Sequence, residues 1–229
     1  MSDCRFKEFL QKEYENLITV DLVCHGVPSP IVWKKYLKRI TKQTGINKIN
    51  FRDKTEGWKK YSFRIELEDG KLIKEWHQEN LFLKGFLQNI YLRPSCYECC
   101  FKGTKRISDI TLADFWGIEK VHSALYDDRG ASLVLLHSDR AIQIWDDISG
   151  VFEKEKTNIN SAIKYNPCIV SSVEKTDKRN IFYGHRIGTF KCLKRLTGGY
   201  REPNTICNIK DLFQRFVNHL MGMDRKNKS

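Results

Sequence analysis

The segment that most constrains this chain runs from Leu92 to Ile118, with the sequence LRPSCYECCFKGTKRISDITLADFWGI. It contains three of the eight cysteines of the chain, at Cys96, Cys99 and Cys100. Two cysteines separated by two residues can bring their thiolates to one metal, because the turn between them folds the second back beside the first. Such a pair occurs in zinc sites, iron–sulfur sites and thiol redox sites, and three cysteines that pack as small apolar side chains are a further alternative.

A basic loop follows the cysteines and contains Lys102, Lys105 and Arg106. Positive charge near a thiol lowers its pKa and favours the thiolate, which is the form that binds metal. We therefore expect these three side chains to lie beside the bound group. At a redox centre they would favour reduction, because positive charge stabilises the reduced state.

Cys24 is the predicted long-range partner of this segment. Residues 18–23 form a β-branched run that predicts a strand, and Ser29 and Pro30 are typical of the first positions of a helix. Cys24 would then lie in the loop between a strand and a helix, where open sheets place ligand-binding groups.

Four thiolates are the usual ligands of a 4Fe–4S cluster or of a structural zinc ion. Cys24, Cys96 and Cys99 supply three of them. The spacing leaves two alternatives for the fourth ligand, Cys100 and Cys4.

Two further residues are candidates for cofactor binding. His25 follows Cys24 directly, and it would either donate a hydrogen bond to a cluster sulfur or a flavin, or be satisfied by the backbone as a structural histidine. Asp114 ends an apolar strand, so it would either orient a ligand, pair with Arg106, or cap the strand end.

The remaining pattern predicts a mixed α/β or α+β architecture, with a mixed sheet flanked by helices and a mostly helical C-terminal region. We expect a core over residues 1–155 and a helical extension over residues 156–229 that packs on it. Asp69 and Gly70 predict a tight hairpin. The predicted strands are 18–23, 48–52, 61–67, 71–76, 109–113 and 131–137, and the predicted helices are 3–16, 31–44, 79–91, 140–148, 157–165, 176–186 and 209–221.

Composition points to a cytoplasmic protein. No apolar run approaches the roughly 18 residues of a membrane helix, and no signal peptide opens the sequence. In a reducing compartment eight cysteines indicate metal binding or burial rather than disulfides. The net charge of +12 would suit a nucleic-acid binder, but no nucleic-acid-binding module is recognisable. We therefore favour a lysine-rich surface that also docks an acidic partner or binds an anionic cofactor.

Four motifs together resemble the C-terminal domain of the coenzyme F-420 hydrogenase/dehydrogenase beta-subunit family. They are VDLVCHGVPSP at 20–30, RPSCYECCFKG at 93–103, SDITLADFWGI at 108–118 and GASLVLLHS at 130–138. The resemblance covers most of residues 7–140. It implies an iron–sulfur flavoprotein of the oxidoreductase class, which passes electrons between a hydride carrier, often a deazaflavin, and a partner through FAD and a 4Fe–4S cluster.

The resemblance implies that Cys24, Cys96 and Cys99 are ligands of the cluster. Family members have an upstream segment with a Gly-Thr-Pro-Cys turn, and Met1 takes the place of that cysteine here. Cys4 or Cys100 would then replace it, or the cluster lacks a ligand. The flavin site of the family also draws on the upstream segment, so activity would need a redox partner protein or a missing N-terminal half.

Two other functions fit the same sequence. One is a zinc-stabilised binding module that uses its basic surface, and the other is a truncated, non-catalytic remnant of the family. Metal content separates the first from an iron–sulfur protein, because a zinc site holds neither iron nor sulfide.

Overall fold

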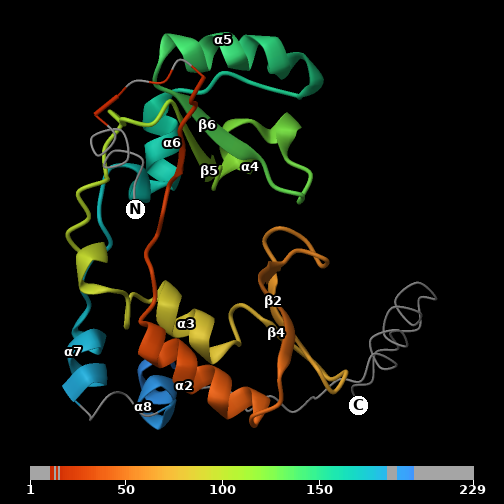
Figure 1. Ribbon diagram of the computed structural model, residues 1–229, viewed down its shortest axis with the longest axis vertical. Coiled ribbons are helices and arrows are strands. Elements are labelled where there is room, and N and C mark those ends of the chain that lie inside the picture. Colours follow the sequence, from red (N-terminus) through yellow and green to blue (C-terminus); the bar gives the residue numbers. More distant parts are fainter. Residues whose placement is uncertain (1–10, 13, 15, 185–189, 199–229) are drawn as a thin grey trace. The chain divides into compact units, whose positions relative to one another are not determined.

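The computed structural model of the chain describes residues 11–12, 14, 16–184 and 190–198 (Figure 1). The candidate ligand Cys4 lies outside these residues. So does the predicted helix over 209–221, and most of the one predicted over 3–16.

The chain divides into two compact units, each built from two separate segments. The first unit comprises Met1–Val27 and Leu92–Glu174, and the second comprises Pro28–Tyr91 and Lys175–Ser229. The chain therefore leaves the first unit after Val27 and returns to it at Leu92. The division into a core of residues 1–155 and an extension of residues 156–229 stays a prediction.

The first unit contains a mixed three-stranded sheet, as the sequence predicts. Its strands are β1 (Val20–Leu22), β5 (Ile110–Asp114) and β6 (Ser132–Leu136), in the order β1-β5-β6. β1 runs parallel to β5, and β6 runs antiparallel to it.

The buried carboxylate of Asp109 holds the start of β1 next to the start of β5. The Thr19 hydroxyl donates to Asp109 Oδ2 at 2.7 Å, and the Thr19 N–H donates to the same oxygen at 2.9 Å. Ser138 donates to the other carboxylate oxygen at 2.8 Å. Through these neutral donors Asp109 holds three segments of the unit together, which is a structural role.

Short helices accompany this sheet in the first unit: α4 (Ile118–Val121), α5 (Asp139–Ile148) and α6 (Ile159–Tyr165). α5 begins where the sequence predicts, because the Ser138 side chain accepts a hydrogen bond from the Ala141 N–H. The buried core of the unit consists of Phe115, Ile118, Leu133, Ala162 and Ile169.

The second unit contains an antiparallel sheet of β2 (Ile46–Asp53), β3 (Ser62–Leu67) and β4 (Leu72–Trp76). The predicted hairpin between β3 and β4 is confirmed. Gly70 adopts a φ of +79°, and its N–H donates to Leu67 O at 3.0 Å. Glycine suits this turn because it reaches positive φ without a steric penalty.

The described α-helices of the second unit are α2 (Pro30–Thr41), α3 (Leu81–Leu87), α7 (Asp177–Gly184) and α8 (Phe190–Leu196). α2 begins at Pro30 with Ser29 at the N-cap position, as predicted, but the Ser29 side chain makes no capping hydrogen bond. The predicted end of α2 at Gly45 is wrong, because the chain turns earlier, with Lys42 in the left-handed region at φ 49°. α3 is shorter than the predicted 79–91. Asn80 caps its start by accepting from the Leu83 N–H at 2.8 Å, and the helix ends before Asn89, which adopts a left-handed φ of 58°.

The core of the second unit is large and aromatic. Its buried residues are Val32, Tyr36, Tyr61, Phe63, Ile65, Leu67, Ile73, Leu81, Phe82, Leu83, Ile90, Tyr91, Phe182 and Leu193. Within the residues that the structure describes, no helix is both long enough and apolar enough to cross a membrane.

Candidate metal centre

Two loops of the first unit meet at the candidate centre. The loop after β1 carries Cys24, and the one-turn helix η1 (Pro94–Cys96) carries Cys96. The Val27 N–H donates to Cys96 Sγ at 3.2 Å, although the two residues lie 69 positions apart. The Arg93 N–H donates to Val27 O at 2.8 Å, so the backbone itself ties the loops together.

The close fit of these loops requires a glycine at position 26. A Cβ atom there would lie 2.8 Å from Leu92 Cδ1. Gly26 therefore lets the Cys24 loop approach the segment that leads into the cysteine motif.

The Cys24 thiol is influenced electrostatically by its surroundings, including Cys96 and Cys99. Partial burial raises the pKa of the Cys24 thiol, while the Lys102 ammonium and a hydrogen bond from the Gly26 N–H oppose this change. Cys96 and Cys99 raise the same pKa further, because each thiolate places negative charge near the next. A cationic group bound among the three sulfurs would remove this repulsion.

The cysteines differ in exposure. Cys96 and Cys99 are partly buried, whereas Cys24 and Cys100 are exposed. The Cys99 N–H donates to Ser172 Oγ at 2.9 Å, which fixes the second cysteine of the pair. Cys168 and Cys192 are partly buried, and Cys192 lies on α8 in the second unit.

Among the described residues, no three His, Cys, Asp or Glu side chains are arranged to hold a single metal ion. A four-iron cluster has a different requirement, because it spreads its thiolate ligands over separate iron atoms. The donor set here is chemically suited to such a cluster: three soft sulfur donors, with amide N–H groups directed at two of them.

The three basic side chains of the loop have different surroundings. Lys102 Nζ donates to Cys24 O at 2.6 Å and to Cys168 O at 2.9 Å. Lys105 is exposed. The Arg106 guanidinium is buried, with its side chain 7% exposed, and pairs with Asp21 Oδ2 at 3.1 Å rather than with Asp114.

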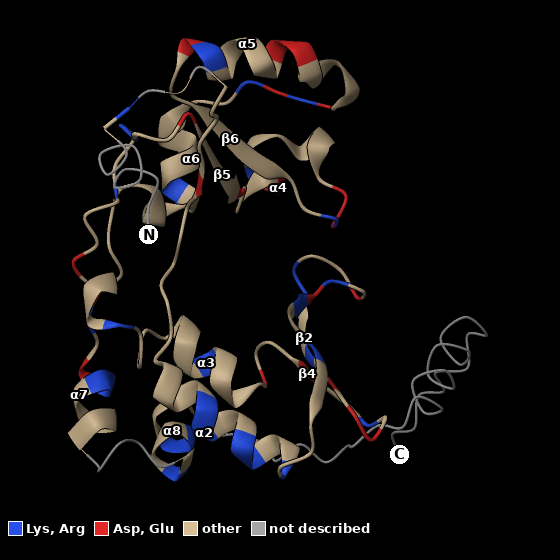
Figure 2. Ribbon diagram, in the orientation of Figure 1, with Lys and Arg blue, Asp and Glu red and all other residues tan. Residues whose placement is uncertain are grey.

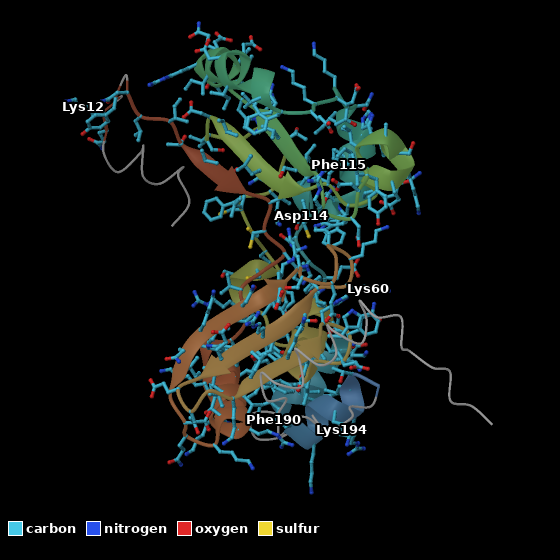
Figure 3. All side chains as sticks on the ribbon, turned by 90° about the vertical axis from the view of Figure 1, so that its right-hand side faces the viewer. Lys12, Lys60, Asp114, Phe115, Phe190 and Lys194 are labelled. Atoms are coloured by element: carbon cyan, nitrogen blue, oxygen red, sulfur yellow. The ribbon has the colours of Figure 1, made fainter. Side chains whose placement is uncertain are left out.

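His25 lies beyond the carboxyl end of β1, and Asp114 lies at the carboxyl end of β5, the parallel neighbour of β1. His25 is partly buried in the loop after β1. Asp114 is the last residue of β5, beside Phe115 (Figure 3). Their roles in cofactor binding stay predictions.

Sequence reasoning missed a polar network on the sheet of the first unit. Asp21 pairs with Arg106, and His137 Nε2 lies 2.9 Å from the buried Thr111 hydroxyl. Burial lowers the pKa of His137, and Arg106 lowers it further, while Asp21 and Asp109 oppose the change. A charged residue within the apolar run Val20–Val23 was the available signal for this network.

Comparison with known proteins supports the resemblance. Residues 5–160 match a family model that describes the C terminus of the beta subunit of coenzyme F420 hydrogenase/dehydrogenase. No curated protein and no solved structure matches the sequence. Because the matched residues make up more than half of the chain, the protein belongs to the family of C-terminal domains of coenzyme F420 hydrogenase/dehydrogenase beta subunits.

Proposed function

We propose that this chain is the iron–sulfur electron-transfer domain of an oxidoreductase related to F420 hydrogenase/dehydrogenase beta subunits. Cys24, Cys96 and Cys99 would hold a 4Fe–4S cluster, with either Cys100 or Cys4 as the fourth ligand. The observation that carries this proposal is the meeting of the two cysteine loops. Consecutive amides, those of Gly26 and Val27, donate to the sulfurs of Cys24 and Cys96.

The surrounding residues would stabilise negative charge on the sulfurs. Amide N–H donors and the Lys102 ammonium favour thiolates, and the same groups favour the reduced form of a redox centre. When bound, a 4Fe–4S cluster takes up and releases one electron at a time. The chain's own contribution is to orient the sulfurs and to set the local charge.

The flavin and the hydride donor belong to the same proposal. The matched family model describes only the C-terminal part of a longer polypeptide. FAD, and a deazaflavin or another hydride donor, would therefore bind together with an N-terminal part or a redox partner protein. The residues that we propose for contact with the cofactors, in a cytoplasmic protein, are His25, Lys102, Lys105, Arg106 and Asp114.

Anaerobic purification followed by iron, sulfide, zinc and flavin analysis tests this function. We expect iron and sulfide in amounts that correspond to one cluster, with an absorption spectrum typical of iron–sulfur proteins. Cys24→Ser, Cys96→Ser and Cys99→Ser should each lower the iron content, while Cys192→Ser, a change in the second unit, should not.

Two results would contradict the proposal. One is a protein without iron after anaerobic reconstitution, and the other is a Cys96→Ser variant that keeps its full iron content. Zinc without iron or sulfide would instead support a zinc-stabilised binding module. Comparison of Cys100→Ser with Cys4→Ser identifies the fourth ligand.

A further inference from the structure

The charge of the chain is divided unequally between the two units. Over its residue ranges the second unit contains 27 Lys and Arg against 11 Asp and Glu, a net charge of +16. The first unit contains 13 against 17, a net charge of −4. The basic character of the protein therefore belongs to the unit without the candidate metal centre.

Helix α2 gathers this charge on one face. Val32 and Tyr36 are buried in the core and Trp33 packs against it, whereas Lys34 and Lys35 are exposed. Lys34, Lys38 and Lys42 follow one another at intervals of four residues, which places them in one row about 6 Å apart along the helix axis. Exposed side chains on this side of α2 are Ile31, Lys34, Lys35, Lys38, Arg39 and Lys42.

Helix α8 extends the same surface. The Arg39 guanidinium lies over the Phe190 ring, 5.4 Å from its centroid, so α2 and α8 pack together. α8 adds the exposed Lys191, Lys194 and Arg195. Neither helix contains an acidic residue (Figure 2), and Phe190 and Lys194 mark α8 in Figure 3. We call the exposed basic residues of the two helices, together with Ile31, the α2–α8 basic face.

This arrangement is unfavourable for α2 by itself. Like charges four residues apart destabilise a helix, because they lie next to each other on its surface. Lys34, Lys38 and Lys42 form no ion pair with any residue in the described ranges. Lys42 also adopts a left-handed backbone conformation, which favours glycine or asparagine. An anionic partner would remove the repulsion between these lysines.

We propose that the α2–α8 basic face docks an acidic helix of a partner protein. A second helix with carboxylates at intervals of four residues has the same repeat as the lysine row. Ile31, 55% exposed, lies on the same side of α2 as Lys34 and Lys38, and offers an apolar contact that a protein partner can bury.

Nucleic acid fits this face less well. Single-stranded binders stack bases on exposed aromatic rings, but Trp33 and Tyr36 of α2 pack against the core. The row consists of lysines, which lack the bidentate geometry with which arginine binds phosphate. The proposal does not depend on the metal centre, so docking can be measured on the protein without a cluster.

The test uses fluorescence anisotropy with two labelled helical peptides of equal composition. One carries glutamates at intervals of four residues along a single face, and the other distributes them around the helix. The protein variants are a triple change Lys34→Gln, Lys38→Gln and Lys42→Gln, and a control triple change Lys48→Gln, Lys54→Gln and Lys60→Gln. The control removes three exposed lysines of the same unit that lie outside α2 and α8.

We expect the one-face peptide to bind more tightly than the distributed one. The α2 changes should weaken its binding about tenfold, because three charge pairs of about 0.5 kcal/mol each amount to roughly that factor. The control changes should weaken it less than about twofold. Circular dichroism of both variants confirms that the fold is kept.

Equal losses for the two triple variants would overturn the proposal, because they would indicate attraction by net charge alone. Equal binding of the two peptides would also overturn it. A DNA duplex that binds more tightly than either peptide, and loses that binding with the α2 changes, would make the face a nucleic-acid site instead.

Discussion

The Lys102 ammonium donates a hydrogen bond of 2.6 Å to the backbone carbonyl oxygen of Cys24, 78 residues earlier in the sequence. It also reaches Cys168 O at 2.9 Å. One side chain therefore connects three segments of the first unit, and its charge counteracts the effect of burial on the pKa of the Cys24 thiol. The basic loop acts on the cysteines through this single residue, since Arg106 pairs with Asp21 and Lys105 is exposed.

Replacement of Lys102 by methionine should destabilise the first unit. The change leaves two carbonyl oxygens without their charged donor, and hydrogen bonds to charged groups contribute about 1.5–3 kcal/mol. Because Lys102 is partly exposed, we expect a loss of about 1–2 kcal/mol in the free energy of unfolding, measured with urea on the protein without metal. Lys105→Met is the matched control and should change stability by less than about 0.5 kcal/mol. Equal losses in the two variants would contradict the role of Lys102.

Arg106→Leu should be more damaging than Arg129→Leu. Arg106 is buried, whereas the side chain of its partner Asp21 is 22% exposed, so the ion pair is partly buried. Removal of one partner of a fully buried pair costs about 3–5 kcal/mol, and because water reaches Asp21 we expect a smaller loss of about 1–3 kcal/mol. Arg129 pairs with Asp127 at the surface, with 88% of its side chain exposed, so its loss should cost less than about 1 kcal/mol. Thermal and urea unfolding measure both variants. A similar change in both would show that burial does not strengthen the Arg106 pair.

Gly85→Ala should destabilise the second unit although alanine is the better helix former. A Cβ atom at position 85 would lie 2.4 Å from Tyr91 Cε1 and 2.8 Å from Leu193 Cδ1, and both side chains are buried. Overpacking of this kind costs about 1–3 kcal/mol. Gly184→Ala, in the same unit and with open space around the added atom, is the control for the unfolding measurement. If Gly85→Ala is as stable as Gly184→Ala, the packing around α3 is looser than described.

Glu75→Gln should change how stability depends on pH. Burial raises the pKa of Glu75, Glu79 adds to the increase, and the hydrogen bond from Asn80 opposes it. The folded chain therefore holds this proton more tightly than the unfolded chain, and stability falls as pH rises from the ordinary Glu pKa of about 4.3 through the raised value.

The glutamine variant should accordingly be more stable than the parent at neutral pH, by more than the roughly 0.5 kcal/mol of a typical surface change. Below pH about 4 the difference should vanish, because Glu75 is then protonated in both states. Urea unfolding across this pH range measures the effect, and Glu68→Gln, at an exposed position of the same unit, should not show it. A loss of stability at neutral pH would mean that the Glu75 carboxylate is favourable in the fold.

Lys42→Gly should stabilise the fold and weaken binding of the acidic peptide. Glycine adopts a φ of 49° without strain, so we expect a gain of about 0.5–1 kcal/mol in the free energy of unfolding. Lys38→Gly, inside α2, should instead lose about 1 kcal/mol. Both variants should bind the one-face acidic peptide more weakly than the parent. A stability change of the same sign in both would contradict the backbone argument.

Local signals in the sequence predicted the elements well. Pro30 marks the start of α2, and Asp69 and Gly70 mark the β3–β4 turn, because helix starts and tight turns depend on a few neighbouring residues. The end of α2 at Lys42 could not be read in this way, since Gly45 offered the better local signal.

These local signals could not predict contacts between residues that are far apart in the sequence. The pairing of Val20 with Ile110 joins strands 90 residues apart, and the separation of two sheets into two units depends on such pairings. The contact of Arg106 with Asp21 depends on them as well. For the metal centre, the sequence supplied the candidate cysteines, whereas the hydrogen bond from Val27 to Cys96 became visible only in the fold.

The hydrogen bond between Arg93 and Val27 has a consequence for how such proteins can diversify. The segment Pro28–Tyr91 belongs to the second unit, and this hydrogen bond joins the two points at which it is attached to the first unit. Cys24 comes just before the segment and Cys96 just after it. The loops of this segment can lengthen or shorten without pulling the sulfur atoms apart, because its ends stay fixed, while its core keeps the packing against Phe182 and Leu193. Distant relatives should therefore be sought with a variable gap between these two cysteines.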